Sequence, residues 1–262
     1  MKKIPASFFI VLFLCNFAYN QIQSTDEKAE AIIKRAVEKL GGQKYLQAKS
    51  IVSSGNYSLL LEGQPQQFSG FTDVIVFPDK ERTEFKQGGV KNVQTNTGAG
   101  GWLFDGSARI VKEQSKTEVE DFRRGVRTSL DNLLRGNWRK VEGVELSYAG
   151  RRQAGIGKRS DVVKLAYPDD FAVEFEFSDD GFPAKAVYKR TNSSGEELKE
   201  EDRFAQFVEV QGIYVPFVLD HFINGKHASR INYVNIEFDK KIPDSFFAKP
   251  DDVKKLKKDL KL

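Results

Sequence analysis

The fold is decided by a stretch that begins Phe68-Ser-Gly-Phe-Thr-Asp-Val-Ile-Val-Phe-Pro78. The stretch continues through a charged turn and a glycine-broken strand, and it ends in the hairpin sequence Gly100-Gly-Trp-Leu-Phe-Asp-Gly-Ser-Ala-Arg-Ile-Val-Lys-Glu113. Aromatic and β-branched residues dominate it, and Gly and Pro interrupt it, which is typical of strands joined by turns. It therefore predicts a β-sheet.

The first strand of this stretch is apolar on both faces, because successive side chains of a strand point to opposite sides. One face carries Phe71, Ile75 and Phe77, and the other carries Thr72, Val74 and Val76. A strand of this kind needs cover on both sides, or it lines a cavity for an apolar ligand. The pattern favours such a binding cavity over an enzyme and does not identify the ligand.

The start of the chain predicts a secretory signal peptide over residues 1–20. Lys2 and Lys3 precede the unbroken apolar run of residues 8–15, and no further charge occurs before Asp26. The apolar run is much shorter than the roughly 20 residues that a membrane-spanning helix needs. We therefore expect export to the periplasm.

Composition indicates one β-rich domain, expected over residues 21–250, which must be held together by its core. Cys15 is the only cysteine, so no disulfide is expected, and Leu14 precedes it where lipid-modified cysteines follow a small residue. A formal net charge of +4 is too balanced to favour nucleic acid as a partner. Residues 251–262 form a basic tail, expected as a short helix, with transient membrane-surface contact as the alternative.

The first element expected after the signal peptide is a helix. Ser24 and Glu27 have the spacing of a capping box, and Gly41-Gly42 ends the helical pattern. From Ser50 the apolar residues alternate with a period of two, which indicates a strand, and Gly55 predicts a bulge or bend in it.

A second amphipathic helix is expected between Thr117 and Gly136, with Thr117 and Glu120 as its capping box. Its apolar stripe consists of Val119, Phe122, Val126, Leu130 and Leu133. This stripe must lie on the sheet, because nothing else in the pattern could bury it. The opposite side carries Arg123, Arg124 and Arg127. These arginines form either a solvated helix face or a contact with an anionic head group.

The rest of the chain returns to strands. Residues 145–151 and 161–167 are expected to pair, and the alternating segment 171–177 follows them. The last strand is expected over residues 229–238. Short consecutive strands with tight turns predict an antiparallel meander.

Chemistry-bearing motifs are sparse. His221 and His227 flank an expected turn without the spacing of a zinc site, and Gly157-Lys-Arg-Ser160 lacks the first glycine of a phosphate-binding loop, where Arg152 stands. We therefore predict no catalytic residues, no metal and no cofactor.

Several segments carry a resemblance to a known family. They are Asp73–Arg82, Asn96–Gly106, Phe175–Pro183, Gly212–Pro216 and Ile242–Pro250. Together they resemble the LolA/LolB superfamily of periplasmic outer-membrane lipoprotein-sorting carriers, over nearly the whole chain after the signal peptide. The resemblance implies an unclosed β-barrel whose cavity takes acyl chains without performing chemistry. One departure is Phe77, which stands where the soluble carrier has an arginine before the turn proline that fastens its helical lid.

We therefore expect an α+β fold, a strongly curved antiparallel sheet forming an unclosed half-barrel with helices packed on its concave face. The expected ligands are lipid or lipoprotein acyl chains, with envelope proteins as further partners. The alternative function is an envelope protein-interaction or sensory module without cargo. The residues expected to line one shared cavity are Phe71, Ile75, Phe77, Trp102, Phe104, Phe122, Val126 and Leu130.

Overall fold

The structure is a computed structural model that describes residues 26–192 and 194–257. The signal peptide and Ser24 lie outside these residues and stay predictions. The strands of the first part are β1 (Ser50–Leu61), β2 (Gln64–Val76), β3 (Lys80–Gln87), β4 (Val90–Thr97), β5 (Gly101–Asp105) and β6 (Ile110–Glu113). Those of the second part are β7 (Glu145–Gly155), β8 (Lys158–Ala166), β9 (Ala172–Ser178), β10 (Pro183–Thr191), β11 (Glu197–Val210), β12 (Ile213–Ile223) and β13 (Lys226–Phe238).

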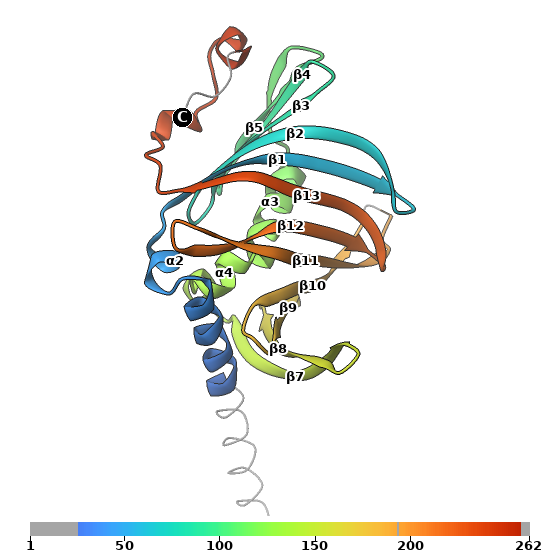
Figure 1. Cartoon of the computed structure of the whole chain (residues 1–262). Helices are drawn as coiled ribbons and strands as arrows, with labels where there is room; N and C mark the ends of the chain where they lie inside the picture. The colour runs from blue at the N-terminus through green and yellow to red at the C-terminus, as the bar shows by residue number, and fades with distance from the viewer. Residues whose placement is uncertain (1–25, 193, 258–262) are drawn as a thin grey trace, which may run out of the picture.

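Within the described residues these strands form one 13-stranded antiparallel sheet, strongly curved and not closed (Figure 1). The order across it is β6-β5-β4-β3-β2-β1-β13-β12-β11-β10-β9-β8-β7. Neighbours in the sheet are thus neighbours in the chain, except that the first strand pairs with the last. This confirms the expected meander and half-barrel.

The helices are residues 26–40, α2 (Gln43–Gln47), α3 (Lys116–Thr128), α4 (Leu130–Leu134) and the 3₁₀ helices η2 (Asn137–Lys140), η3 (Asp244–Phe246) and η4 (Val253–Lys257). The segment α3–α4–η2 joins the two edge strands, β6 and β7, and therefore crosses the concave side of the sheet (Figure 1). None of the helices in the described part of the chain is long and apolar enough to span a membrane.

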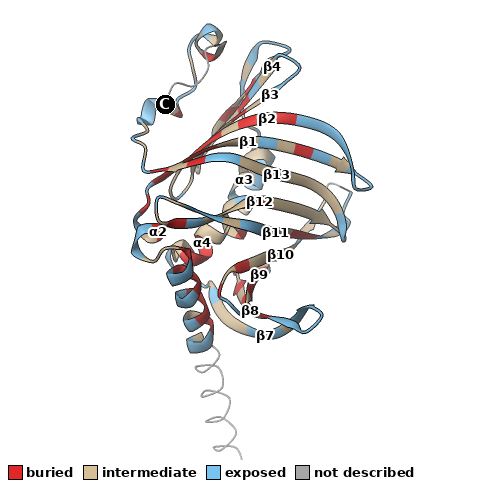
Figure 2. Cartoon of the chain, viewed as in Figure 1, coloured by how far each residue is buried: buried red, intermediate tan, exposed pale blue. Residues whose placement is uncertain are grey.

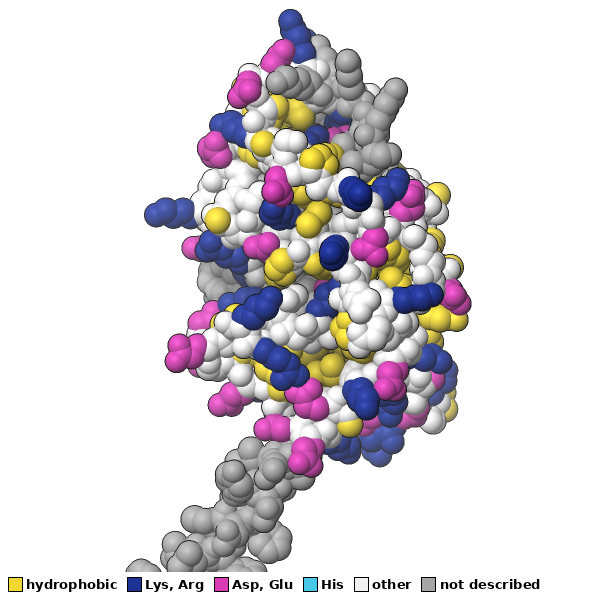
Figure 3. All heavy atoms as spheres, turned by 90° about the vertical axis from the view of Figure 1, so that its left-hand side faces the viewer, with side chains coloured by type: hydrophobic (Ala, Val, Ile, Leu, Met, Phe, Trp, Pro, Cys, Tyr) yellow, Lys and Arg dark blue, Asp and Glu magenta, His cyan; other side chains and the backbone are white. Residues whose placement is uncertain are grey.

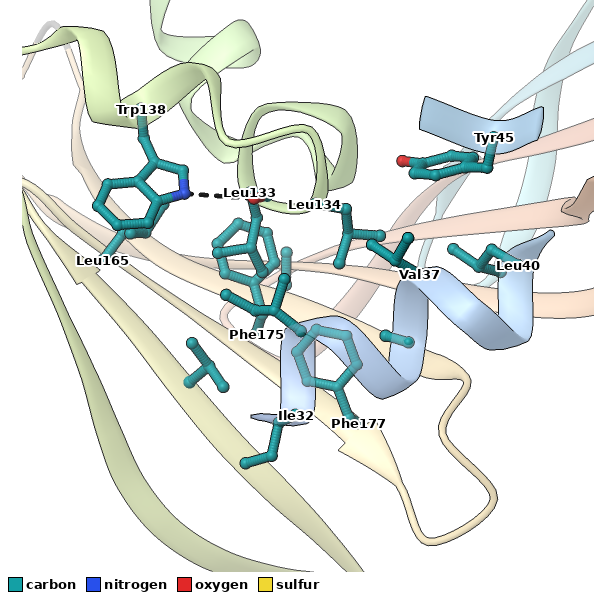
Figure 4. Packing of buried hydrophobic residues seen from close by; sticks show 14 of the residues in the cluster. Ile32, Val37, Leu40, Tyr45, Leu133, Leu134, Trp138, Leu165, Phe175 and Phe177 are labelled. Atoms are coloured by element: carbon teal, nitrogen blue, oxygen red, sulfur yellow. Dashed lines mark hydrogen bonds between the residues drawn. The ribbon is translucent and has the colours of Figure 1, made fainter. Parts of the chain in front are cut away.

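The main core lies where the helices meet the second part of the sheet. Buried residues gather along residues 26–40, α4, β8 and β9 (Figure 2). Leu133 inserts between Leu165, Phe175 and Trp138, and the indole Nε1 of Trp138 donates to the carbonyl of Leu133 at 3.2 Å (Figure 4). This core fixes the position of the helical segment on the concave face.

The start of α3 differs from the prediction. Ser115, not Thr117, is the N-cap, and its reciprocal partner is Glu118. The side-chain hydroxyl of Ser115 accepts from the amide of Glu118, and the Glu118 carboxylate accepts from the amide of Ser115 at 2.7 Å. Both pairs fit the capping-box spacing, but β6 already ends at Glu113, so the chain turns into the helix two residues earlier.

The predicted bulge at Gly55 is confirmed. The pairing of β1 with β13 shifts its register between Ser54 and Gly55. A Cβ at Gly55 would lie 2.1 Å from the carbonyl oxygen of Asn232, so only glycine fits this close approach. The bulge lies near the middle of the sheet, where β1 and β13 join its two parts.

Charged groups of both signs cover the outside of the protein. Figure 3 shows one face on which basic and acidic side chains alternate, with hydrophobic side chains between them. Such a mixed surface agrees with the small formal net charge of +4.

Candidate functional site

An apolar pocket of about 320 Å³ lies between the adjoining ends of β2 and β3 on one side and α3, the start of α4 and the start of η2 on the other. Its apolar walls are formed by Ile75 of β2, by Phe77 of the turn that follows β2, and by Phe122 and Val126 of α3. Ile75 and Phe77 face the same way because they are two residues apart along extended chain. Phe122 and Val126 share a face because they are four residues apart on a helix. Four of the eight predicted residues therefore meet in one pocket.

Arg135 packs beside this pocket and holds the helical segment in place. Its guanidinium lies 3.7 Å from the ring centroid of Phe77 and 4.6 Å from that of Tyr45. It also donates to the carbonyl of Ala48 at 2.8 Å and to the Asp131 carboxylate at 2.7 Å. An arginine from the helices thus covers the phenylalanine that stands before the turn proline.

Two carboxyl groups, the buried Asp73 and the half-buried Glu81, lie on the same side of the sheet as Ile75. Asp73 is 8% exposed and accepts a hydrogen bond from the hydroxyl of Thr83 at 2.8 Å, while Glu81 lines the apolar pocket. Burial raises the pKa of Asp73 to about 6. Burial, together with the charge of Asp73, raises the pKa of Glu81 to about 8. Glu81 therefore enters the pocket at neutral pH as an uncharged hydrogen-bond donor.

Neither group is among the residues predicted from the sequence to line the cavity, although the sequence carries one signal for Asp73. Asp73 is the only polar residue on a face whose other members are Phe71, Ile75 and Phe77. A carboxyl group on an apolar strand face must be neutralised or paired when that face is buried. Glu81 carries no such signal, because it stands in a charged run beside Lys80 and Arg82.

Phe71 and Leu130 lie near the pocket but do not line it. Phe71 is buried, with its ring edge-on to Tyr233 at a centroid distance of 5.6 Å. Leu130 is partly buried and packs against the main core. The structure therefore places both as packing residues beside the pocket walls.

Trp102 and Phe104 do not face this pocket, so the prediction of one wall containing all eight residues is wrong. Trp102 is 3% exposed and Phe104 is 6% exposed, and both are packed with Val93 and Leu256. The indole Nε1 of Trp102 donates to the carbonyl of Phe247 at 2.9 Å. A C-terminal segment, residues 243–257, thus covers both aromatic side chains.

The strand register explains this correction. Val74 pairs with Arg82, Arg82 with Thr95, and Thr95 with Trp102. Residues that pair directly across antiparallel strands share a face of the sheet. Trp102 therefore lies on the face of Val74, which is opposite to that of Ile75, and this part of the sheet is covered on both sides.

A second, larger cavity of about 1020 Å³ opens on the other side of α3. It lies between α3, the β8–β9 turn and the ends of β10 and β11, and the three α3 arginines contribute to its lining. Arg127 forms two hydrogen bonds with the carboxylate of Asp169, at 2.8 and 2.5 Å. The hydrogen bonds from Arg127 lower the pKa of Asp169 to about 2. We call this space the basic cavity.

The histidines take part in local polar contacts. His221 Nδ1 lies 2.7 Å from the Oδ1 atom of Asp202, whose Oδ2 atom accepts from the hydroxyl of Tyr188 at 3.3 Å. His227 contacts Asp220 on the neighbouring strand. Among the residues that the structure describes, no group of three or more His, Cys, Asp or Glu side chains could hold a metal ion.

Comparisons with known proteins concern the fold. No protein-family model and no curated protein matches the chain. A crystal structure of a DUF1329 family protein from Desulfovibrio piger is similar with a TM-score of 0.57 and 12% identity, covering 84% of this chain and 97% of that one.

Two further crystal structures carry names of the family that the sequence resembles. A LolA superfamily protein from Nitrosomonas europaea has a TM-score of 0.56 at 14% identity and covers 84% of this chain and 97% of its own. A domain named as an outer membrane lipoprotein-sorting protein, from Vibrio parahaemolyticus, has a TM-score of 0.55 at 12% identity, with coverages of 88% and 100%. The chain thus has a LolA-like fold.

Proposed function

We propose that this protein is a periplasmic, non-enzymatic binding protein that holds the acyl chain of a lipid or of an acylated protein. The observation that carries the proposal is the apolar pocket between α3 and the sheet, walled by Ile75, Phe77, Phe122 and Val126. The pocket lies under a helical segment that crosses the concave side of an open sheet.

The physical basis of binding is the burial of apolar area. Each methylene group removed from water contributes about 0.8 kcal/mol, which is non-directional and selects poorly among head groups. Glu81, uncharged at neutral pH because burial raises its pKa to about 8, can donate a hydrogen bond to an ester or amide carbonyl next to the chain. Most of the pocket surface is apolar, while seven of its thirteen described lining residues are polar or charged, and an apolar surface with polar groups at its edge is the usual composition of a ligand site.

Two further observations support the proposal. The LolA-like fold is shared with a protein named as a LolA superfamily member, at 14% identity, and with a domain named for outer membrane lipoprotein sorting, at 12% identity. The expected signal peptide over residues 1–20 supports a periplasmic location.

The test compares two matched substitutions. Phe122→Glu places a carboxylate in the wall of the pocket, whereas Phe68→Glu makes the same change at a residue that is 61% exposed. We expect the purified protein to bind a fluorescently labelled diacylglycerol, an uncharged acyl probe. Phe122→Glu should weaken this binding more than about tenfold, because a charge buried in an apolar site is strongly disfavoured, and Phe68→Glu should not.

Circular dichroism of both variants establishes that the sheet is intact. A folded Phe122→Glu variant that binds the probe as the natural protein does would overturn the assignment of this pocket. A natural protein that takes up no acyl probe would overturn the proposed function itself.

A further inference from the structure

The basic cavity has an excess of positive charge. Among the described residues that line it, eight are Lys or Arg and five are Asp or Glu, which leaves three positive charges in excess. The whole chain has a formal net charge of only +4. Over the described residues Lys and Arg outnumber Asp and Glu by only one, so the described residues outside this lining carry a net charge of −2, and a cavity with such an excess of positive charge attracts anions.

The cations come from elements that are distant in the sequence. Arg123 and Arg127 project from α3, Lys164 from β8, and Arg190 from the end of β10. β9 begins at Ala172, and its pairing with β10 reaches only as far as Tyr188. The last residues of β10, up to Thr191, therefore have no β9 residue beside them, and the cavity lies at this place. A solvated helix face alone would not bring strand cations to the same space.

Two of these cations keep donors available for a ligand. In the described part of the chain, Arg123 forms no ion pair, and its one hydrogen bond runs from Nε to the carbonyl of Gly98 at 2.9 Å. Lys164 has neither an ion pair nor a side-chain hydrogen bond within the same residues. Arg127 is held differently, by Asp169 and by the ring of Tyr167 at 3.9 Å. Arg127 is thus preorganised, while Arg123 and Lys164 remain free to bind an anion.

The geometry of α3 connects the basic cavity to the apolar pocket. Phe122 and Val126 form one wall of the pocket, and the adjacent Arg123 and Arg127 line the basic cavity on the other side of the same helix. A helix with its side chains is about 10–12 Å across. One amphiphile that passes around this helix therefore reaches both spaces, with its acyl chain in the apolar pocket and its head group in the basic cavity.

We propose that the basic cavity binds phosphate, and that the phosphate belongs to the head group of the amphiphile whose chain enters the apolar pocket. Guanidinium groups suit this role because they bind phosphate oxygens with two parallel hydrogen bonds. The lipid source of the phosphate rests on the proposed function, whereas the affinity of the cavity for phosphate does not.

The experiment uses two lipids that differ only in phosphate, dioctanoyl phosphatidic acid and dioctanoylglycerol, and measures their binding to the purified protein by calorimetry. The variant Arg123→Gln/Lys164→Gln removes the two available cations. The control Lys34→Gln/Arg109→Gln removes the same charge at exposed residues outside the cavity.

We expect the natural protein and the control to prefer phosphatidic acid about tenfold or more, and the cavity variant to lose most of this preference. Binding of dioctanoylglycerol should be equal in all three proteins. The preference should also shrink as salt is added, because screening weakens charge interactions in an open cavity.

The phosphate site is overturned if the natural protein binds both lipids with equal affinity, or if the cavity variant keeps the preference for phosphatidic acid. Neither result contradicts the acyl-binding pocket. Inorganic phosphate, titrated in a separate arm, distinguishes the source. Phosphate that binds as tightly as phosphatidic acid overturns the assignment to a lipid head group. If neither lipid binds, the proposed function is wrong. The phosphate site is then supported if the natural protein binds inorganic phosphate and the cavity variant does not, and it is overturned if the two proteins behave alike.

Discussion

At the scale of single residues, Glu81 is an acidic side chain that is uncharged at neutral pH in the folded protein. Its carboxyl group lines an apolar pocket, and the nearby carboxyl of Asp73 adds an unfavourable like charge. Both effects favour the protonated form, so the pKa of Glu81 rises from its ordinary 4.5 to about 8. The folded state therefore retains a proton that the unfolded chain releases.

This proton makes stability depend on pH. Because the folded state binds it more tightly, the contribution of Glu81 to the free energy of unfolding is fully present below about pH 4.5 and is lost as the pH rises toward 8. Glu81→Gln cannot ionise, so the variant should be more stable than the natural protein at pH 8, by on the order of a few kcal/mol, and similar to it near pH 4.5. Urea unfolding across this pH range measures the difference.

The exposed Glu142 offers the matched control, since Glu142→Gln changes the same chemical group in solvent. The control should follow the stability of the natural protein at every pH. A Glu81→Gln variant whose stability falls between pH 4.5 and 8 as steeply as that of the natural protein would show that Glu81 is ionised in the folded state.

At the scale of elements, the helical segment shows what a periodic pattern can and cannot predict. The apolar stripe correctly indicated that the segment packs on the sheet, because helical spacing requires a buried side. It did not indicate the break at Ser129, whose extended backbone ends α3 and whose side-chain hydroxyl caps α4 by accepting from the amide of Asn132. Leu130 consequently begins a new helix and lies outside the pocket.

The α4 helix contributes most to the core through Leu133. This side chain is 1% exposed, whereas Leu130 is only partly buried. Leu133→Ala should lower the free energy of unfolding by about 2–5 kcal/mol, because it removes transfer energy and leaves a cavity. Leu61→Ala, at a residue 64% exposed, is the control and should change the stability little. Equal stability of the two variants in thermal or urea unfolding would contradict the packing of Leu133 in the core.

The positions of the strands were largely predictable from the sequence. Which part of the chain covers each face of the sheet was not. Alternation and turn residues placed the hairpins, and Gly55 marked its bulge. The wrong prediction for Trp102 has a physical cause. Its side chain lies on an apolar face of the sheet, and the residues that cover this face come more than 140 positions later in the chain. A single sequence shows that such a face is buried but not which part of the chain covers it.

At the scale of the whole molecule, the sheet is covered on both sides by different parts of the chain. The helical segment crosses the concave side between the two edge strands (Figure 1). The C-terminal segment packs on the opposite side, where Phe247 contacts Val74 and Leu256 lies with Trp102. The backbone of this segment is fastened by two side chains of the sheet. Arg82 donates to the carbonyl of Phe246 at 2.8 Å, and Trp102 donates to that of Phe247 at 2.9 Å.

Phe247 anchors the C-terminal segment, because its side chain is 4% exposed and packs with Val52 and Val74. Phe247→Ala should lower the free energy of unfolding by about 3–5 kcal/mol. It should also increase proteolytic cleavage within residues 243–257. Phe68→Ala, at a residue that is 61% exposed, is the control and should do neither. Binding of the uncharged acyl probe should be unchanged in folded Phe247→Ala protein, because the apolar pocket lies on the other face of the sheet. Loss of probe binding by a variant with an intact sheet would therefore show that the C-terminal segment is coupled to the pocket through the sheet.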